Sequence, residues 1–536
     1  MGRDRSRLIT GAAAIPAVFL AIFFVYPVAT VVWRGVGGEG LTPLGDLLES
    51  ARTRDAIVFT FWQATLSTLL TLALALPGAA VIARSSPRAQ RRLRALVTIP
   101  FVLPTVVVAG AFSELFTTFG LDDGDLRLRH TVWAILIAHV FFNYAVVVRT
   151  VGSFWSGLDA RMEEQARVLG AGRLRTFTQI TLPQLRPALA AASAIVFLFS
   201  FTSFGVILVL GGPRQATIET EIYRYAVVRT DFTSGAALAA LQLVAVLALV
   251  ALATRLERAR PLTLSTPHRT TVRRGRIGRV ANGLAITTLL GLPIGVVIER
   301  SLAVGDSHGL ANFRALGTRL SMLPAPATDA IRNSLVYAVV ATVIALCVGT
   351  IAALVVVHGR GAIRHVFDLG LTLPLGTSAV TIGFGILIAL DEPPLDLRSS
   401  WWIVPIAHSL VGVPFVVRTM VPVLRRIDPA LHEAAAVLGA SPRRVRREVD
   451  LPIASRGMLV GASFAFAVSM GEFGATAFIP RRADTLTAPQ ALFRLLTTPG
   501  ELIRGQAMAL AVVLMAIVGL AVFVIESARG TGEGTF

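Results

Sequence analysis

The chain has 536 residues, of which 54% are hydrophobic and only 15% are charged, whereas about a quarter of the residues in soluble proteins are charged. This composition excludes an ordinary soluble protein and predicts a chain that lies in a lipid bilayer. The formal net charge of +18 would suggest nucleic-acid binding in a soluble domain, but here the arginines lie between apolar stretches of membrane-spanning length. We therefore interpret the charge as a signal of membrane topology and expect membrane lipid, but no nucleic acid, as a partner.

A helix needs about 20 mostly apolar residues to cross a hydrocarbon core of about 30 Å. Twelve stretches of the sequence meet this requirement, and the first is long enough to be retained as a span. Their centres lie near Phe19, Leu70, Val107, Ala138, Val196, Ala245, Leu290, Ile344, Gly383, His408, Ala467 and Leu514. The sequence therefore predicts an all-α, multi-pass integral membrane protein with twelve transmembrane helices.

Arginines are concentrated in alternate loops between the predicted spans. One group runs from Arg84 to Arg94 and a second from Arg255 to Arg279, whereas the intervening loops hold acidic residues: Asp122, Asp123 and Asp125 in one, and Asp391, Glu392 and Asp396 in another. Because cytoplasmic loops carry the excess of positive charge, we expect both chain termini to be cytoplasmic. We interpret the acidic groups as solvated outer loops.

The two halves of the chain repeat one plan. Glu164 and Glu433, Pro183 and Pro452, and His139 and His408 are each 269 residues apart, and nearer the start of each half the offset is 274, as between Pro100 and Pro374. Six spans per half give both halves the same orientation, and such parallel repeats place a shared pathway on their pseudo-two-fold axis. We predict a first half at 1–253, a basic cytoplasmic linker at 254–279 and a second half at 280–536.

A repeated cytoplasmic loop, at 159–187 and again at 428–456, is the most informative motif. Asp159 and Asp428 are suited to cap a short helix, and Gly170 and Gly439 permit the left-handed residue that ends it. Small and apolar side chains form a stripe along this helix: Met162, Ala166 and Leu169 in one copy, and Leu431, Ala435 and Leu438 in the other. The pairs Leu182-Pro183 and Leu451-Pro452 are expected to break the chain before the next span.

Such a short helix without a core partner suits a groove on another protein, although it could also pack on its own spans. Its presence in both halves favours a two-fold partner. The pattern of Glu-Ala-Ala, then Gly, then Ile-x-Leu-Pro resembles the ATPase-coupling loop of binding-protein-dependent ABC importer permeases. Gln165 and Val449 are mild departures from it. Within that family, the fused two-half layout resembles the permeases for thiamine and ferric iron, and three stretches, at 61–64, 138–143 and 210–219, are similar to thiamine permeases in particular.

The resemblance implies a partner for each face of a bacterial inner membrane. A dimeric cytoplasmic ABC ATPase, which would bind ATP and Mg²⁺, would push the two coupling helices, and an extracytoplasmic binding protein would deliver thiamine, a thiamine phosphate or, alternatively, ferric iron. The ATPase-coupling residues carried over are Glu164, Ala166, Gly170, Leu182, Pro183, Glu433, Ala434, Ala435, Gly439, Leu451 and Pro452. The chain itself would then not be an enzyme. No lysine occurs in the sequence, so a phosphate-binding loop of the G-x-x-x-x-G-K-[ST] type is excluded.

Other chemistry-bearing residues have competing interpretations. Glu472 lies within an apolar span and could line a route for a cation together with Ser203, Phe204 and Phe473, or it could form a hydrogen bond between helices. His139 and His408 are expected to bond across helices, and neither has metal-ligand spacing with another residue. An ion-coupled secondary transporter remains an alternative, but it should show several charged residues in mid-span, where Glu114 and Glu472 are nearly alone. Cys347 is expected to be a small buried residue.

Overall fold

The computed structural model describes residues 11–37, 40, 42–122, 127–212, 214–258, 283–284, 286–359, 367, 370, 374, 377–391, 396–397, 400–479 and 482–528. Its first half contains α2 (Ala14–Leu20), η1 (Ala21–Val25), α3 (Tyr26–Val32), η2 (Trp33–Gly37), α4 (Thr42–Glu49), α5 (Ala51–Ala83), α6 (Pro87–Val102), α7 (Thr105–Thr118), α8 (Val132–Ser156), α9 (Ala160–Val168), α10 (Arg173–Thr176), η3 (Phe177–Thr181), α11 (Leu182–Phe201), α12 (Gly205–Leu210), α13 (Ile218–Tyr223), η4 (Arg224–Val228) and α14 (Phe232–Arg258).

The second half repeats this order. It contains η5 (Thr287–Gly291), α16 (Leu292–Leu302), the strands β1 (Ala303–Val304) and β2 (Ser307–His308), α17 (Ala311–Ala315), α18 (Ala327–His358), α20 (Ala379–Ala389), α21 (Ile403–Arg425), α22 (Pro429–Val437), α23 (Pro442–Val445), η6 (Arg446–Asp450), α24 (Leu451–Gly471), η7 (Thr476–Phe478), α25 (Ala488–Thr497) and α26 (Glu501–Ala528). The two strands form one antiparallel pair. Helices α5, α8, α9, α11 and α14 thus correspond to α18, α21, α22, α24 and α26.

Nine helices in the described part of the chain are long and apolar enough to cross a membrane, and each contains one of the predicted span centres. The remaining three predicted centres lie in other helices. The stretch around Val107 is a pair of helices, Leu96–Val102 and Thr105–Thr118, bent by 104° next to Pro104. Gly383 lies in the shorter apolar helix α20, and Leu290 lies in η5, which continues into α16. The all-α membrane architecture is confirmed.

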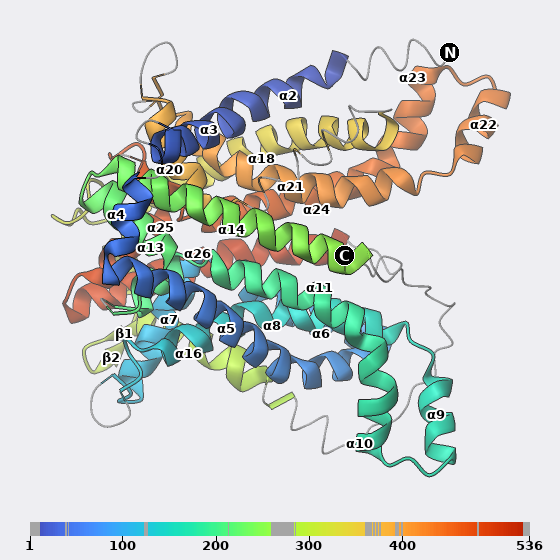
Figure 1. Cartoon of the computed structure of the whole chain (residues 1–536), viewed down its shortest axis with the longest axis horizontal. Coiled ribbons are helices and arrows are strands. Elements are labelled where there is room, and N and C mark those ends of the chain that lie inside the picture. Colours follow the sequence, from blue (N-terminus) through green and yellow to red (C-terminus); the bar gives the residue numbers. More distant parts are fainter. Residues whose placement is uncertain are drawn as a thin grey trace.

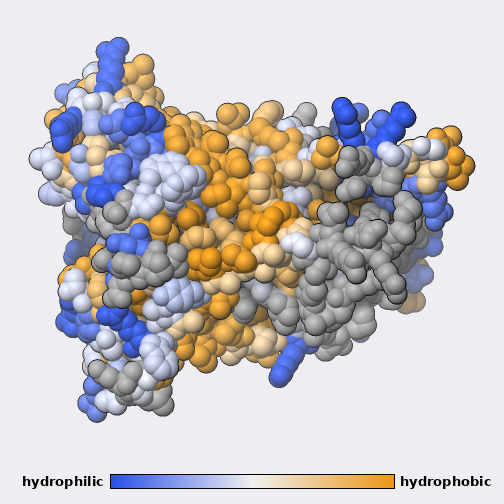
Figure 2. Space-filling view, turned by 90° about the horizontal axis from the view of Figure 1, so that it is seen from above, coloured by the Kyte–Doolittle hydropathy of each residue, from blue (hydrophilic) through white to orange (hydrophobic). Residues whose placement is uncertain are grey.

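The helices run side by side between two polar ends. In Figure 1, α9 and α10 project with α22 and α23 from one end, while α4, α13, α25 and the β1–β2 pair lie at the other. A broad band of hydrophobic residues covers the middle of the face seen in Figure 2, and hydrophilic residues gather at both ends. This pattern matches a bilayer with an aqueous phase on each side. Both repeated loops therefore lie on one side of the membrane, as the parallel repeat predicts.

The first span of each half packs on the opposite half. The buried core of the second half includes Leu20 and Phe24 from the first span, and the core of the first half includes Ile286 and Leu290. Helix α3 contacts α20, and α16 contacts α7. A third buried cluster runs between the halves. Because the chain crosses over in this way, neither half buries its apolar surface alone.

One prediction, that Cys347 is buried, is wrong, and the predicted linker stays largely untested. Cys347 is exposed on the outer face of α18 rather than buried, because a lipid-facing position is as apolar as a core and an apolar run does not distinguish them. The predicted linker begins at Thr254, whereas α14 continues to Arg258, and most of the linker lies outside the described residues.

Candidate functional site: two coupling loops and a central cavity

The two repeated loops have the same local geometry. The side chain of Asp159 accepts a hydrogen bond from the N–H of Arg161 at 3.0 Å, and that of Asp428 accepts one from the N–H of Ala430 at 2.9 Å. The helices that follow, α9 and α22, have nine residues each and occupy equivalent positions. The predicted aspartate caps are confirmed, and they satisfy N–H groups that a helix start leaves without partners.

Both helices also end in the same way. Gly170 and Gly439 have φ angles of +86° and +79°, a region that favours glycine. The N–H of Ala171 donates to the carbonyl of Ala166 at 2.9 Å, and that of Ala440 donates to Ala435 at 2.9 Å. These are the bonds of a Schellman cap, which reverses the chain tightly after a helix. The prediction that a left-handed glycine ends each of these helices is confirmed.

The tips of the loops carry apolar side chains in water. Val168, Leu169, Val437 and Leu438 are each between 85% and 87% exposed, immediately before the two capping glycines. Ala166 is instead buried, whereas Met162 and Leu169, the other members of the predicted stripe in the first loop, are exposed. The glutamates Glu164 and Glu433 and the neighbouring Ala434 are exposed, while Ala435 is half-buried. Leu169 and Leu438 belong to the predicted stripe, whereas Val168 and Val437 were not singled out in the sequence.

The Leu-Pro pairs do not break the chain. Leu182 and Pro183 begin α11 directly after the π-helical turn η3, and one continuous helix runs from Arg173 to Phe201. Leu451 and Pro452 begin α24 after η6 in the same way. In a π turn the backbone hydrogen bonds join residues five positions apart instead of four. A proline in the turn that follows has no N–H to leave unpaired, so the helix continues. The loop is therefore joined to the span by a helix rather than by a hinge.

A cavity of about 290 Å³ lies between the two halves. Phe204 and Phe473 occupy equivalent positions in the repeat, and their rings stack at 5.5 Å between centroids with 19° between planes. Two equivalent residues that contact each other must lie at the pseudo-two-fold axis, so the cavity lies on that axis. Its lining from both halves includes Phe101, Thr105, His139, Phe142, Asn143, Phe199, Thr202, Ser203, Phe204, Ser378, Phe415, Phe464, Glu472 and Phe473.

The helices that follow the coupling loops are interrupted at this cavity. Helix α11 ends at Phe201 and α24 ends at Gly471, and Ser203 and Glu472 are equivalent residues in the two breaks. Glu472 is 8% exposed and accepts a hydrogen bond from the N–H of Ala475 at 2.7 Å. The structure brings Ser203, Phe204, Glu472 and Phe473 together at this cavity, which is the arrangement that the cation-route interpretation requires. Five further phenylalanines line it, two from α11 and α24 themselves and three from α6, α8 and α21, and no spacing in the sequence identified them.

The two equivalent histidines are bonded across helices. His139 lies 2.9 Å from Ser67 and 2.9 Å from Ser203, so it connects α5 to the break after α11. His408 lies 2.7 Å from Ser469 of α24. The described residues contain no group of three or more His, Cys, Asp or Glu side chains placed to hold a metal ion. Both histidines thus follow the structural interpretation of the sequence.

Two short helices cover the cavity on the side away from the coupling loops. Helices α13 and α25 each begin with a capping box, at Thr217 and Thr487. Tyr223 of α13 contacts both Phe204 and Phe478, at centroid distances of 5.4 and 5.8 Å, and Phe493 of α25 contacts Phe473 at 5.2 Å. The aromatic rings around the axis are therefore packed beneath α13 and α25.

Several buried carboxylates are held by partners from other elements. Glu114 of α7 forms an ion pair with Arg300 of α16 at 2.7 Å, which joins the two halves. Glu221 of α13 accepts from Arg52 at 2.9 Å and also pairs with Arg224. Glu219, on α13 outside the candidate spans, accepts from Gln242 at 2.5 Å, and burial raises its pKa to about 7. Glu114 and Glu221 thus stabilise contacts between helices rather than forming a relay.

The model of one protein family matches both halves of the chain. Its description is "Binding-protein-dependent transport system inner membrane component", and it matches residues 75–260 and 314–527. The chain belongs to this family. It is a multi-pass permease component of an ABC importer, and one matched segment lies in each half of the chain.

Curated relatives of this permease carry different substrate names. It is 24% identical over 468 residues to the probable ABC transporter permease protein y4fN of Sinorhizobium fredii, with 81% of each chain covered. It is 28% identical over 445 residues to the thiamine transport system permease protein ThiP of Brucella abortus, with 78% of each covered. It is 32% identical to a putative 2-aminoethylphosphonate transport system permease protein, PhnV of Salmonella typhimurium, over 46% of this chain and 94% of that one. A solved bacterial ABC transporter for alginate has a chain that is 20% identical, with a TM-score of 0.40, over 48% of this chain and 98% of its own.

Proposed function

We propose that this permease imports thiamine or a thiamine phosphate across a bacterial inner membrane, with both of its termini in the cytoplasm. An extracytoplasmic binding protein delivers the substrate to the face covered by α13 and α25. A dimeric cytoplasmic ATPase binds ATP and Mg²⁺, hydrolyses ATP and acts on the two loops at the opposite face. The permease itself provides the path and has no catalytic role.

The lining of the central cavity is the observation that carries the choice of substrate. Among the described residues, seven phenylalanines and one carboxylate, that of Glu472, line a volume of about 290 Å³ on the axis. The thiazolium ring of thiamine is a permanent cation, and its pyrimidine ring is aromatic. Aromatic faces attract cations and stack with aromatic rings, and a nearby carboxylate supplies the opposite charge. We assign Glu472, Ser203, Phe204 and Phe473 to the translocation path on this basis.

The two coupling loops support an ATPase partner. Each exposes a glutamate, Glu164 or Glu433, on the same short helix as an exposed aliphatic pair. Apolar side chains at the tip of a rigid, well-capped helix suit insertion into a groove. Two such helices at one end of the molecule suit a two-fold partner (Figure 1). Glu164 and Glu433 would then face basic groups of the ATPase.

Ferric iron is the alternative substrate within the same class of importer. Hard cations prefer carboxylate, carbonyl and water oxygens. The cavity instead offers mainly phenylalanine rings, with Glu472 as the carboxylate of its lining. This donor set favours an organic cation over ferric iron.

Uptake measurements test this proposal. Cells that lack the gene should lose uptake of labelled thiamine, and the wild-type gene should restore it, with ferric-iron uptake unchanged. Glu472→Gln keeps the size of the side chain and an oxygen for the N–H of Ala475 but removes the charge, so it should lower thiamine uptake about tenfold or more. Glu501→Gln, an exposed carboxamide substitution at the start of α26, is the matched control. Iron dependence, or a purified partner binding protein that carries iron, would reverse the assignment.

A further inference from the structure

A side-chain contact at equivalent positions ties each coupling helix to the helix behind it. In the first loop the hydroxyl of Thr181 donates to Glu163 at 2.7 Å. In the second loop His432 and Asp450 lie 2.6 Å apart between the imidazole Nε2 and a carboxylate oxygen. Glu163 and His432 are 269 residues apart, and so are Thr181 and Asp450. The contact is therefore present twice, although its chemistry differs.

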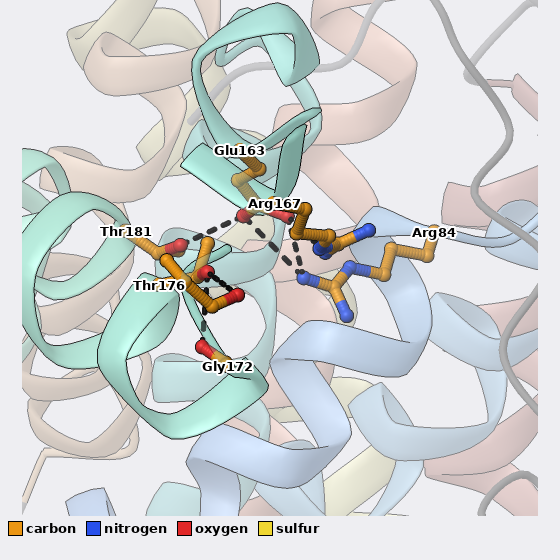
Figure 3. A network of polar contacts seen from close by, with 7 residues as sticks. Arg84, Glu163, Arg167, Gly172, Thr176 and Thr181 are labelled. Atoms are coloured by element: carbon orange, nitrogen blue, oxygen red, sulfur yellow. Dashed lines mark hydrogen bonds and ion pairs between the residues drawn. The ribbon is translucent and has the colours of Figure 1, made fainter. Parts of the chain in front are cut away.

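In the first half the tie is the centre of a larger network. Figure 3 shows Arg84 and Arg167 converging with Thr181 on the carboxylate of Glu163. The distances from Glu163 are 3.1 Å to Arg84 and 3.2 Å to Arg167, and its side chain is only 12% exposed. Arg84 follows the cytoplasmic end of α5 and also lies 5.4 Å from the ring of Trp155 in α8. Glu163 thus connects the coupling helix α9 to η3 and to the ends of two further spans.

Among the described side chains, fewer contacts meet at the tie in the second half. His358, which is equivalent to Arg84, lies 3.3 Å from the carbonyl of Leu354 in its own helix. The side chains of His432 and Asp450 are 31% and 23% exposed, so water reaches both. The second coupling helix, α22, packs chiefly on α23, as α9 packs on α10 and η3. Because the tips of both helices are exposed, a tie at this point fixes the direction in which each tip projects.

We propose that these two contacts transmit force: Glu163–Thr181 and His432–Asp450 hold each coupling helix rigidly against the continuous helix that leads to the cavity. The second members of the ties, Thr181 and Asp450, directly precede Leu182 and Leu451, at which α11 and α24 begin. Helices α11 and α24 in turn end at the breaks that hold Ser203 and Glu472. A push on the loop therefore moves the cavity wall instead of bending the loop. Glu163, Thr181, His432 and Asp450 are positioning residues, and this role rests on the proposed ATPase coupling.

The proposal can be tested in the complete transporter, with its ATPase and binding protein, by replacing the His432–Asp450 pair with the acid and hydroxyl pair of the first half. His432→Glu places two carboxylates opposite each other and should break the second tie, whereas H432E/D450T restores the acid and hydroxyl pair of the first half. Thr181→Val removes only the donated hydroxyl of the first tie. We expect H432E to lower transport about tenfold, which corresponds to a coupling of about 1.4 kcal/mol, and H432E/D450T to recover most of it.

Two further readouts separate the tie from the docking surface. Co-purification of the ATPase should stay at the wild-type level in H432E, because the exposed tip residues are unchanged, while ATP hydrolysis should lose its dependence on loaded binding protein. Equal transport by H432E and wild type, or no recovery in the double variant despite normal membrane insertion, overturns the tie. If wild-type permease fails to bind any ATPase, the proposed function fails instead, and the two outcomes are distinct.

Discussion

The exposed aliphatic pairs at the loop tips allow a quantitative prediction of ATPase binding. Leu169 and Leu438 are 86% and 85% exposed in the isolated permease, so docking into a groove removes most of their surface from water. Truncation to alanine removes three carbons, and at about 0.8 kcal/mol per buried methylene it costs about 2 kcal/mol at each site. One substitution should therefore weaken binding about 30-fold. The loops lie in separate halves (Figure 1), so L169A/L438A should weaken it about a thousandfold.

The assay is titration of purified ATPase onto the permease in lipid nanodiscs, with the dissociation constant measured for each variant. Leu310→Ala is the matched control, because Leu310 is 57% exposed and directly precedes α17 at the opposite end of the molecule. Its affinity should equal that of the wild type. A change below about twofold in L169A/L438A would refute the argument that the tips enter a groove.

Three further predictions concern the frame that carries the loops and the cavity. Gly439→Ala forces a residue with a side chain to φ +79° at a cost of about 1 kcal/mol, so limited proteolysis should cleave this loop faster than in wild type; an unchanged rate contradicts the role of the cap. Arg300→Met leaves Glu114 buried without its ion pair and should lower the unfolding temperature, at a cost of about 1 to 3 kcal/mol because Arg300 is partly exposed, whereas Arg300→Lys should be milder. Burial raises the pKa of Glu219 from 4.5 to about 7, so its protonated form is favoured in the fold and its contribution to stability should be lost as the pH rises from about 4.5 to about 7; E219Q should remove this loss, and a wild type that gains stability over that range contradicts it.

The fold and the loops could be predicted from the sequence because their signals are local or repeated. Apolar length identified the spans, and the constant offset identified the two halves. Aspartate caps and the glycines Gly170 and Gly439 act within a few residues, so their roles were readable without tertiary structure. The repeat predicted a shared pathway on the axis, and Phe204 and Phe473 contact each other there.

The rest depended on contacts between distant segments. The crossing of the first spans onto opposite halves, seen in the positions of Phe24 and Leu290, leaves no mark on local periodicity. The Leu-Pro pairs were misread as breaks, because the sequence does not reveal the π turn before them. A proline directly after that turn has no N–H that needs an acceptor, so the helix continues. The tie between His432 and Asp450 uses different side chains from the equivalent tie between Glu163 and Thr181 in the first repeat. A search for identical residues could therefore not find it.

The most direct test of the central claim is uptake of labelled thiamine by proteoliposomes that contain the permease, its ATPase and the binding protein. The account predicts uptake only when ATP and Mg²⁺ are on the side of the coupling loops. It also predicts that uptake falls sharply in both E472Q and L169A/L438A, while ATPase binding is lost in the second variant alone. Uptake that continues without ATP, or that both variants leave unchanged, would contradict it.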